Sequence, residues 1–312
     1  MTSTPTSWRS RSGGSPVANA DSAALNRRCP DHESFNVLRT RLITAVALLA
    51  LIGAAAAWGG TALLALFALL VAAAMYEWMR LAGCSLVLSA GVAAVYGALL
   101  VGTSALDVRA SDGVNAAASL AACTLWCGLG AAVGCAERGR LTVGRGASMI
   151  LALALLTAGW MALDSLLQKG LQWLVSVLAV VWIADIAAYF TGRALGRHKL
   201  APRVSPGKTW EGVYGALAFV TVTALVVYGR WPHARLWSNH LLAEVAWPFA
   251  LAALWCLVAL SIVGDLFESL LKRQAQVKDS GRLLPGHGGV LDRIDATLPT
   301  LPAAVLIDWW TR

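Results

Sequence analysis

A charged stretch near the C-terminal end of the sequence carries the residue types that phosphate chemistry needs. It runs from residue 264 to 295, between two apolar runs, and its charged residues are Asp265, Glu268, Asp279, Asp292 and Asp295 with Lys272, Arg273, Lys278, Arg282 and Arg293. Loops that only orient a membrane protein carry mainly Lys and Arg. Carboxylates suit a divalent cation and basic side chains suit phosphate, so this mixture indicates a metal-dependent phosphate site.

The same stretch predicts a helix, a turn and a second helix. Residues 266–279 contain good helix formers and neither Gly nor Pro. One face of this helix carries Asp265, Glu268, Lys272, Gln276 and Asp279. The glycine-rich turn at 285–289 could bring backbone N–H groups close to a ligand. A second helix is expected to open around Asp292, Arg293 and Asp295, with its positive end near the glycines. For the first helix alone, a solvated face with ion pairs is the alternative interpretation.

A second polar constellation lies upstream. Asp185 stands inside an apolar run, where a carboxylate costs about 2.5–3.5 kcal/mol unless it faces a cavity or a partner. A site role is therefore expected, with structural pairing as the alternative, and Tyr189 shares its helix face. The next segment could cradle a phosphate or simply touch lipid headgroups, through Ser205, Lys208, Thr209 and Glu211. It is not a Walker A motif, because Pro202 stands where the first glycine should be.

The composition indicates which elements must position these residues. The 312-residue chain is 58% hydrophobic and 13% charged, with a mean hydropathy of +0.64, which is typical of a polytopic membrane protein. Its formal net charge of +8 is scattered over the N-terminal tail and alternate loops. That distribution fits membrane orientation and anionic lipid, and it excludes the single basic face of a nucleic-acid-binding protein.

Apolar runs predict an all-α bundle of about nine transmembrane helices. The runs lie at residues 42–57, 61–76, 83–103, 115–134, 146–163, 171–190, 212–229, 243–263 and 288–310. Residues 1–36 are expected to be a disordered polar tail. Residues 37–312 then form a single transmembrane catalytic domain, in which 185–295 carries the site.

Lysine and arginine fall mainly in alternate loops, which places the N-terminus and the site on the cytoplasmic side. With nine spans the C-terminus would face out. Residues 42–163 are expected to be apolar scaffold. Within them, Glu77 and Arg80 are interpreted as an interfacial ion pair at a helix end.

Both constellations resemble the phosphatidate cytidylyltransferase (CDP-diacylglycerol synthase) family. Downstream, the resemblance runs from Ser269 to Asp295 through SLLKR, KDSG, LPGHGG and DRID, without a departure from the family pattern. Upstream, it comprises Asp185, the AYF and GR groups at 188–193, Gly196, KLAP at 199–202 and SPGKTWEG at 205–212. The resemblance is close over about residues 185–295 and extends to the earlier helices only in general character.

The resemblance implies transfer of the cytidylyl group of CTP to phosphatidic acid, giving CDP-diacylglycerol and pyrophosphate in the cytoplasmic membrane. Mg²⁺ is the implied cofactor, and a second cation is a further candidate. The expected metal ligands are Asp265, Asp279, Asp292 and Asp295. The expected catalytic residues are Lys272, Arg273, Lys278, His287 and Arg293. The expected substrate-binding residues are Asp185, Tyr189, Ser205, Lys208, Thr209, Gly288 and Gly289. Membrane lipids are further partners, a homodimer is a candidate assembly, and nucleic acid is not expected.

Three other functions stay open. A related CTP-dependent enzyme could act on another lipid phosphate or on a polyprenol. An ion-coupled transporter also places acids and bases inside the membrane, although the inverted repeats typical of many transporters are not visible in the sequence. A non-catalytic membrane scaffold would tolerate neutralisation of the charges between residues 265 and 295.

Overall fold

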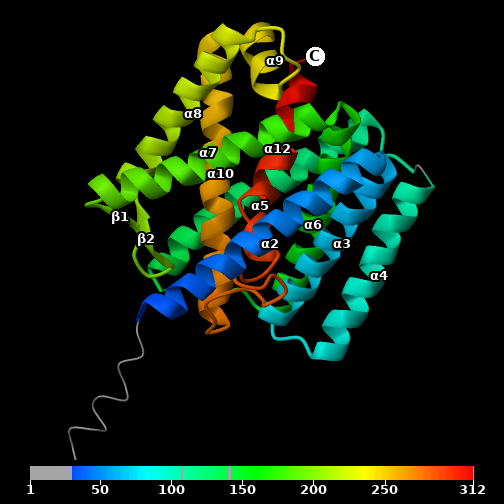
Figure 1. The fold of residues 1–312 in the computed structure, drawn as a ribbon, viewed down its shortest axis with the longest axis vertical. Coiled ribbons are helices and arrows are strands. Elements are labelled where there is room, and N and C mark those ends of the chain that lie inside the picture. The colour runs from blue at the N-terminus through cyan, green and yellow to red at the C-terminus, as the bar shows by residue number, and fades with distance from the viewer. Residues whose placement is uncertain (1–29, 107, 140–141, 312) are drawn as a thin grey trace, which may run out of the picture.

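The fold is an all-α bundle with one short β-hairpin, as the computed structural model in Figure 1 shows. The structure describes residues 30–106, 108–139 and 142–311. Of the predicted polar tail, residues 1–29 lie outside the described residues. Residues 30–36 belong to the first turns of a helix that begins at Pro30.

The first half of the chain forms α2 (Pro30–Trp58), α3 (Gly60–Leu81), α4 (Leu86–Ala105), α5 (Asp112–Glu137) and α6 (Arg145–Gln168). The second half forms α7 (Leu171–Leu195), β1 (Lys199–Ala201), β2 (Ser205–Thr209), α8 (Trp210–Arg230), α9 (Trp237–Glu244), α10 (Trp247–Gln274), α11 (Leu291–Ile294) and α12 (Thr297–Trp310). Several helices begin where a hydroxyl accepts a free N–H of the first turn, at Ser85, Ser111 and Thr209.

Seven of the described helices are long and apolar enough to cross a membrane, namely α3, α4, α5, α6, α7, α8 and α10. This agrees with the polytopic membrane class, but not with a count of nine full spans. The apolar part of α2, Leu42–Trp58, is shorter, and α12 has 14 residues. The predicted span at 288–310 begins as loop and α11, and only its later part is α12.

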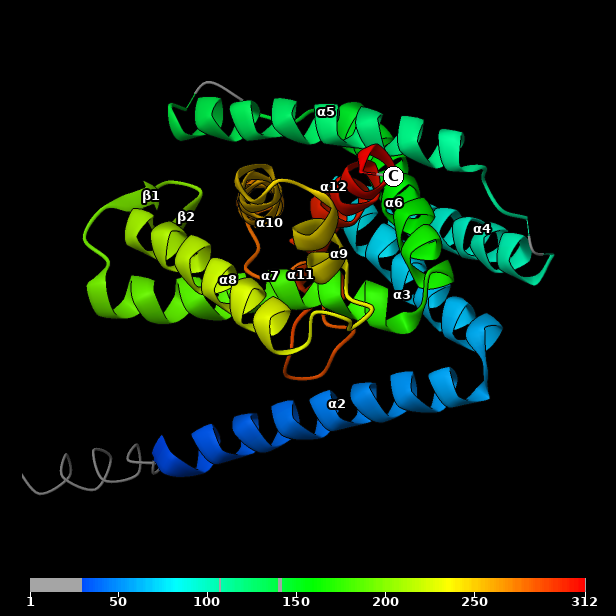
Figure 2. The ribbon, with the colours of Figure 1, turned by 90° about the horizontal axis from the view of Figure 1, so that it is seen from above.

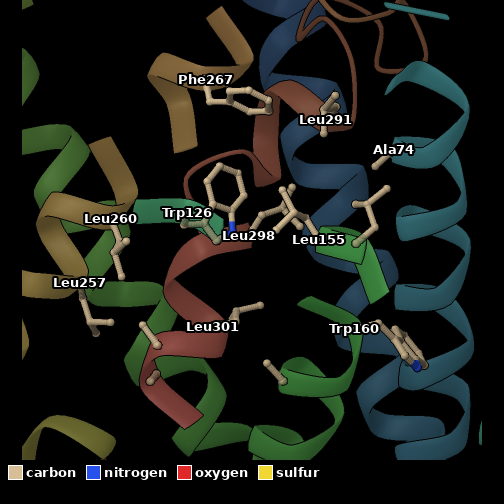
Figure 3. Packing of buried hydrophobic residues seen from close by; sticks show 14 of the residues in the cluster. Ala74, Trp126, Leu155, Trp160, Leu257, Leu260, Phe267, Leu291, Leu298 and Leu301 are labelled. Atoms are coloured by element: carbon tan, nitrogen blue, oxygen red, sulfur yellow. The ribbon is translucent and has the colours of Figure 1, made fainter. Parts of the chain in front are cut away.

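The short helix α12 lies inside the bundle, where it contacts α5, α6, α7 and α10. Residues 296–305 are all buried, so their apolar side chains face other helices. Figure 3 shows Leu298 and Leu301 of this helix pointing into the same core as Leu155 and Trp126. A central helix covered by its neighbours does not need the length of a lipid-facing span.

Aromatic packing fixes the part of α10 that carries charge. The ring of Phe267 lies 6.0 Å from that of Trp78 on α3 and 5.8 Å from that of Trp126 on α5, in an edge-to-face arrangement with the latter. All three side chains are buried. Because Phe267 lies between Asp265 and Glu268 in the chain, its anchorage also sets the direction of those carboxylates.

Two further features concern the loops. Figure 2 shows α2 on the outside of the bundle, beside the loop that follows α10. Thr44 of α2 donates a hydrogen bond from its hydroxyl to the carbonyl of Pro285, 2.8 Å away. The helices α7 and α8 lie side by side and are joined by the β1–β2 hairpin, at an end of the bundle away from the C-terminus (Figure 1).

Candidate functional site

A cavity of about 490 Å³ lies between α7, β2, the start of α8 and α10. Its wall includes predicted site residues from both constellations, namely Asp185, Tyr189, Ser205, Lys208, Thr209 and Asp265. The remaining wall is mostly small or apolar, with Ala184, Ala216 and Ile262 among its residues. The fold therefore brings the upstream constellation to the first carboxylate of the downstream stretch.

One ion pair joins the two constellations directly. Lys208 on β2 places its Nζ atom 2.7 Å from Oδ2 of Asp265 on α10, and both side chains remain partly exposed to the cavity. Thr209 accepts the N–H of Gly212 and so begins α8. Tyr189, by contrast, is 57% exposed and its hydroxyl accepts a hydrogen bond from Arg193.

The hairpin that carries Lys208 is tied to two other helices. At its turn, Glu137 at the end of α5 accepts the N–H groups of Arg203, at 3.0 Å, and of Val204, at 2.6 Å. Arg273 of α10 donates from Nε to the Val204 carbonyl, 3.3 Å away. The structure thus places the predicted catalytic residue Arg273 against the hairpin turn, where it holds backbone.

A glycine allows the second carboxylate to approach Asp265. A Cβ atom on Gly264 would lie 2.3 Å from the Asp295 carbonyl, so only glycine permits this contact between α10 and the chain after α11. Burial raises the pKa of Asp295 to about 7, and the negative charge of Asp265 contributes in the same direction. The negative charges of the Asp265 and Asp295 carboxylates repel each other, and a cation bound between them would relieve this repulsion.

The next charged group on α10 is Lys272, which bridges two acids. Its Nζ atom lies 2.5 Å from Glu268 Oε2 and 2.7 Å from Asp292 Oδ1. Burial alone would raise the pKa of Asp292, but hydrogen bonds with Glu268, Lys272 and the Gly289 N–H lower it to about 2. Asp292 therefore stays ionised as the acceptor at the centre of this cluster.

The loop after α10 departs from the predicted helix. The helix ends at Gln274, because Gln276 adopts a left-handed conformation with φ 56 and the Val277 N–H returns to the Lys272 carbonyl. The prediction of a helix reaching Asp279 was wrong: glycine is the usual residue at such a helix end, and here glutamine occupies it. Gln276 and Asp279 consequently do not continue the charged helix face.

The predicted residues of this loop lie around Gly288. Lys278 and Asp279 are exposed. A Cβ on Gly288, whose φ is +81, would lie 2.9 Å from Asp292 Oδ2 and 3.5 Å from Asp279 Cβ. The Gly289 N–H is already used inside the protein, since it donates to Asp292 Oδ2 at 2.8 Å.

His287 and Arg293 are connected through the backbone. Arg293 donates to the His287 carbonyl from Nε, at 3.0 Å, and also from Nη2. The His287 Nδ1 atom is buried and has no hydrogen-bond partner among the described residues. The second helix expected here is much shorter than a usual helix, because α11 spans only Leu291–Ile294 before α12 begins at Thr297.

The interpretation of Glu77 as the partner of Arg80 was wrong. The Glu77 side chain is 1% exposed, and its Oε2 atom accepts the Ser280 hydroxyl at 3.1 Å and the Leu291 N–H at 2.8 Å. Arg80 instead donates to the Cys84 carbonyl. The sequence carried a signal, since Glu77 directly follows the apolar run 61–76 and precedes Trp78 and Met79, where a carboxylate is unusual. Glu268 likewise belongs to the predicted charged face, but no site role was predicted for it.

The four predicted metal carboxylates do not form one shell. Asp265 and Asp295 lie near each other, whereas Asp279 and Asp292 flank Gly288. Within residues 30–106, 108–139 and 142–311, no group of three or more His, Cys, Asp or Glu side chains is placed to hold a metal ion. Mg²⁺ is commonly bound by one or two carboxylates together with substrate phosphates, and the Asp265–Asp295 pair fits that donor set.

Comparison with known proteins adds independent information. Residues 39–309 match a family model described as "Cytidylyltransferase family". A protein of Pseudomonas aeruginosa named phosphatidate cytidylyltransferase is 39% identical over 284 residues, which are 88% of this chain and 97% of that protein. Proteins of the same name from Haemophilus influenzae and Brucella suis are 48% identical over 133 residues and 47% identical over 149 residues. These shorter matches cover 43% and 46% of this chain, and 44% and 51% of the two proteins.

Proposed function

The chain belongs to the cytidylyltransferase family, and we propose that the cavity beside its β1–β2 hairpin is where the cytidylyl group moves from CTP to phosphatidic acid. The protein is a phosphatidate cytidylyltransferase, a nucleotidyltransferase that forms CDP-diacylglycerol and pyrophosphate. One observation above all supports this location: the Lys208–Asp265 contact, which joins the two charged constellations inside a single cavity.

The reaction does not require a strong general base. A phosphate oxygen of phosphatidic acid forms a bond to the α-phosphorus of CTP, while the bond from that phosphorus to the bridging oxygen of the β-phosphate breaks and pyrophosphate leaves. Since the attacking oxygen is already ionised, orientation and neutralisation of charge supply most of the catalysis. Ser205, Lys208 and Asp185 would face the lipid phosphate. Lys272 and Lys278 would neutralise the triphosphate and the departing pyrophosphate.

Asp265 and Asp295 would hold Mg²⁺ together with phosphate oxygens of the nucleotide. The ion would neutralise phosphate charge and orient the triphosphate. Asp292 already accepts Lys272 and two backbone N–H groups, so we assign it to holding the loop. Asp279, exposed beside Gly288, is the candidate for contact with a second cation. Arg273, His287 and Arg293 would shape the hairpin and the loop that surround the substrates.

We place the site on the cytoplasmic side of the inner membrane. Two considerations support this orientation: Lys and Arg are concentrated in the segments on the side of the hairpin, and CTP must arrive from water while phosphatidic acid stays in the bilayer. A homodimer remains a prediction. Within the same enzyme class, another lipid phosphate or a polyprenol phosphate is the alternative acceptor.

The test uses purified full-length protein in mixed micelles with CTP labelled at the α-phosphate. Label should enter the lipid phase with phosphatidic acid as acceptor, and should do so much less with a polyprenol phosphate. The Asp265→Asn and Lys208→Met variants should lose this transfer while keeping the elution profile and melting temperature of the parent protein. Transfer at near-parental rates in both variants would show that the reaction does not take place in this cavity.

A further inference from the structure

Glu77 contacts the loop between α10 and α11 from a helix outside both charged constellations. In addition to its two hydrogen bonds, its carboxylate packs directly against loop backbone. A Cβ on Gly289 would lie 2.4 Å from Glu77 Oε2, and a Cβ on Gly281 would lie 2.1 Å from Oε1. At position 289 the Ser280 hydroxyl is closer still, 2.1 Å from such a Cβ, so Glu77 and Ser280 together leave room only for glycine, whereas at position 281 Glu77 alone does so. These contacts explain both glycines without a ligand.

The contact continues from Glu77 to the basic side chain assigned to the nucleotide phosphates. The Ser280 hydroxyl that donates to Glu77 also accepts the Asp292 N–H at 3.3 Å, and the Ser280 N–H donates to Asp292 Oδ2 at 3.0 Å. Asp292 Oδ1 in turn lies 2.7 Å from Lys272 Nζ. A continuous set of hydrogen bonds thus links α3, the loop, α11 and α10.

A carboxylate is an expensive way to fill this position. Burying a polar or charged group costs free energy that only good hydrogen bonds offset, and a packed apolar residue would serve a scaffold helix at least as well. The neighbouring residues Trp78 and Met75 show that α3 otherwise packs with apolar side chains here. The buried Glu77 carboxylate is therefore explained by its hydrogen bonds to the loop between α10 and α11.

We propose that Glu77 is a positioning residue for the transfer reaction. It fixes the loop of residues 280–291 and, through Ser280 and Asp292, sets the position of the Lys272 ammonium. Glu77 itself does not contact a substrate. This inference rests on the proposed function, because Lys272 was assigned there to the phosphates of CTP.

The experiment compares Glu77→Leu, which removes the acceptor, with Glu77→Gln, which keeps an acceptor oxygen of the same reach. Asp164→Asn, at the end of α6 far from the hairpin, controls for the loss of a scaffold carboxylate. We expect kcat to fall about tenfold or more in Glu77→Leu, the factor that corresponds to losing one or two hydrogen bonds to a charged acceptor. The KM for phosphatidic acid should not change. Glu77→Gln should retain most of the activity, and Asp164→Asn all of it.

Amide hydrogen exchange of the same proteins provides a second readout. In Glu77→Leu, exchange should accelerate in peptides covering residues 280–291 and stay unchanged in peptides from α5 and α12. Unchanged kcat together with unchanged loop exchange would overturn the inference, and so would a uniform acceleration in all helices with a matching loss of melting temperature. If the parent protein formed no CDP-lipid at all, the proposed function would fail instead, and loop exchange would still decide whether Glu77 holds the loop.

Discussion

The Lys208 ammonium lies 2.7 Å from Oδ2 of Asp265, so a residue of the hairpin and a residue of α10 neutralise each other across the cavity. Both side chains are partly exposed, at 23% and 35% of their surface, and remain reachable from the cavity. An anion and a cation arriving together could each replace one member of the pair. Before the substrates bind, Lys208 and Asp265 therefore neutralise each other, and each can be released to a substrate group or a cation of opposite charge.

Exchanging the two charges should not restore activity. The Lys208→Asp and Asp265→Lys variants should each lower kcat/KM about 100-fold, because each removes a group that stabilises phosphate charge or its cation. The double variant can re-form the ion pair in reverse, yet it would present the wrong charge at both places. Labelled-CTP transfer measures the activity, and the melting temperature shows whether the double variant re-forms the ion pair. A double variant with near-parental transfer would mean that the pair is only structural.

The Asp295→Asn variant should need more Mg²⁺. Removing one of two carboxylates should raise the Mg²⁺ concentration for half-maximal transfer at least about tenfold. Asp164→Asn is the matched control and should leave the Mg²⁺ response unchanged. Stabilisation of the purified protein by Mg²⁺ and a non-hydrolysable CTP analogue should weaken in parallel. An unchanged Mg²⁺ requirement in both measurements would exclude Asp295 as a ligand.

Lysine should replace Arg293 poorly although the charge is kept. Arg293 reaches the His287 carbonyl with both Nε and Nη2, a two-pronged contact that a lysine ammonium cannot reproduce. We expect kcat to fall roughly threefold to tenfold in Arg293→Lys, which corresponds to a net loss of about one hydrogen bond. Arg282→Lys, at an exposed position of the same loop, serves as the control. Equal activity of the two variants would argue against a specific role of the His287 contact.

Packing between α7 and α8 should limit the size of residue 215. A Cβ on Gly215 would lie 2.2 Å from Thr191 Oγ1, so Gly215→Leu should destabilise the protein by about 1–3 kcal/mol through overpacking. Gly229 lies on the same helix, and a Cβ added there would have no other atom within 4 Å. Gly229→Leu should therefore leave stability unchanged or slightly improved. Thermal unfolding in detergent compares the two. A Gly215→Leu melting temperature equal to that of Gly229→Leu would contradict the close packing.

The class of the fold was predictable because hydrophobicity alone determines it. Apolar runs located the long helices, and the presence of a carboxylate inside such a run singled out Asp185, which lines the cavity. Counting spans was less successful, since an apolar run does not reveal whether lipid or protein surrounds it. The short helix α12 is apolar because the bundle encloses it.

The parts of the site that sequence reasoning misassigned depend on contacts between distant segments. Nothing in the local sequence shows that Glu77 accepts the Leu291 N–H, or that Arg273 turns toward the hairpin. The end of α10 was missed for a different reason, because Gln276 adopts a backbone conformation that its side chain does not favour. The sequence predicted that acidic and basic side chains are concentrated between residues 264 and 295, and tertiary packing decided which of them form hydrogen bonds with the backbone.

Two acids from the first half of the chain, Glu77 and Glu137, each grip the backbone of one loop from the second half. A fragment beginning at α7 would contain every residue of the family signature, but both loops would lack the hydrogen bonds that Glu77 and Glu137 accept. Such a fragment, whether produced by truncation or grafted onto another membrane protein, would be recognisable by its motif and inert as a catalyst.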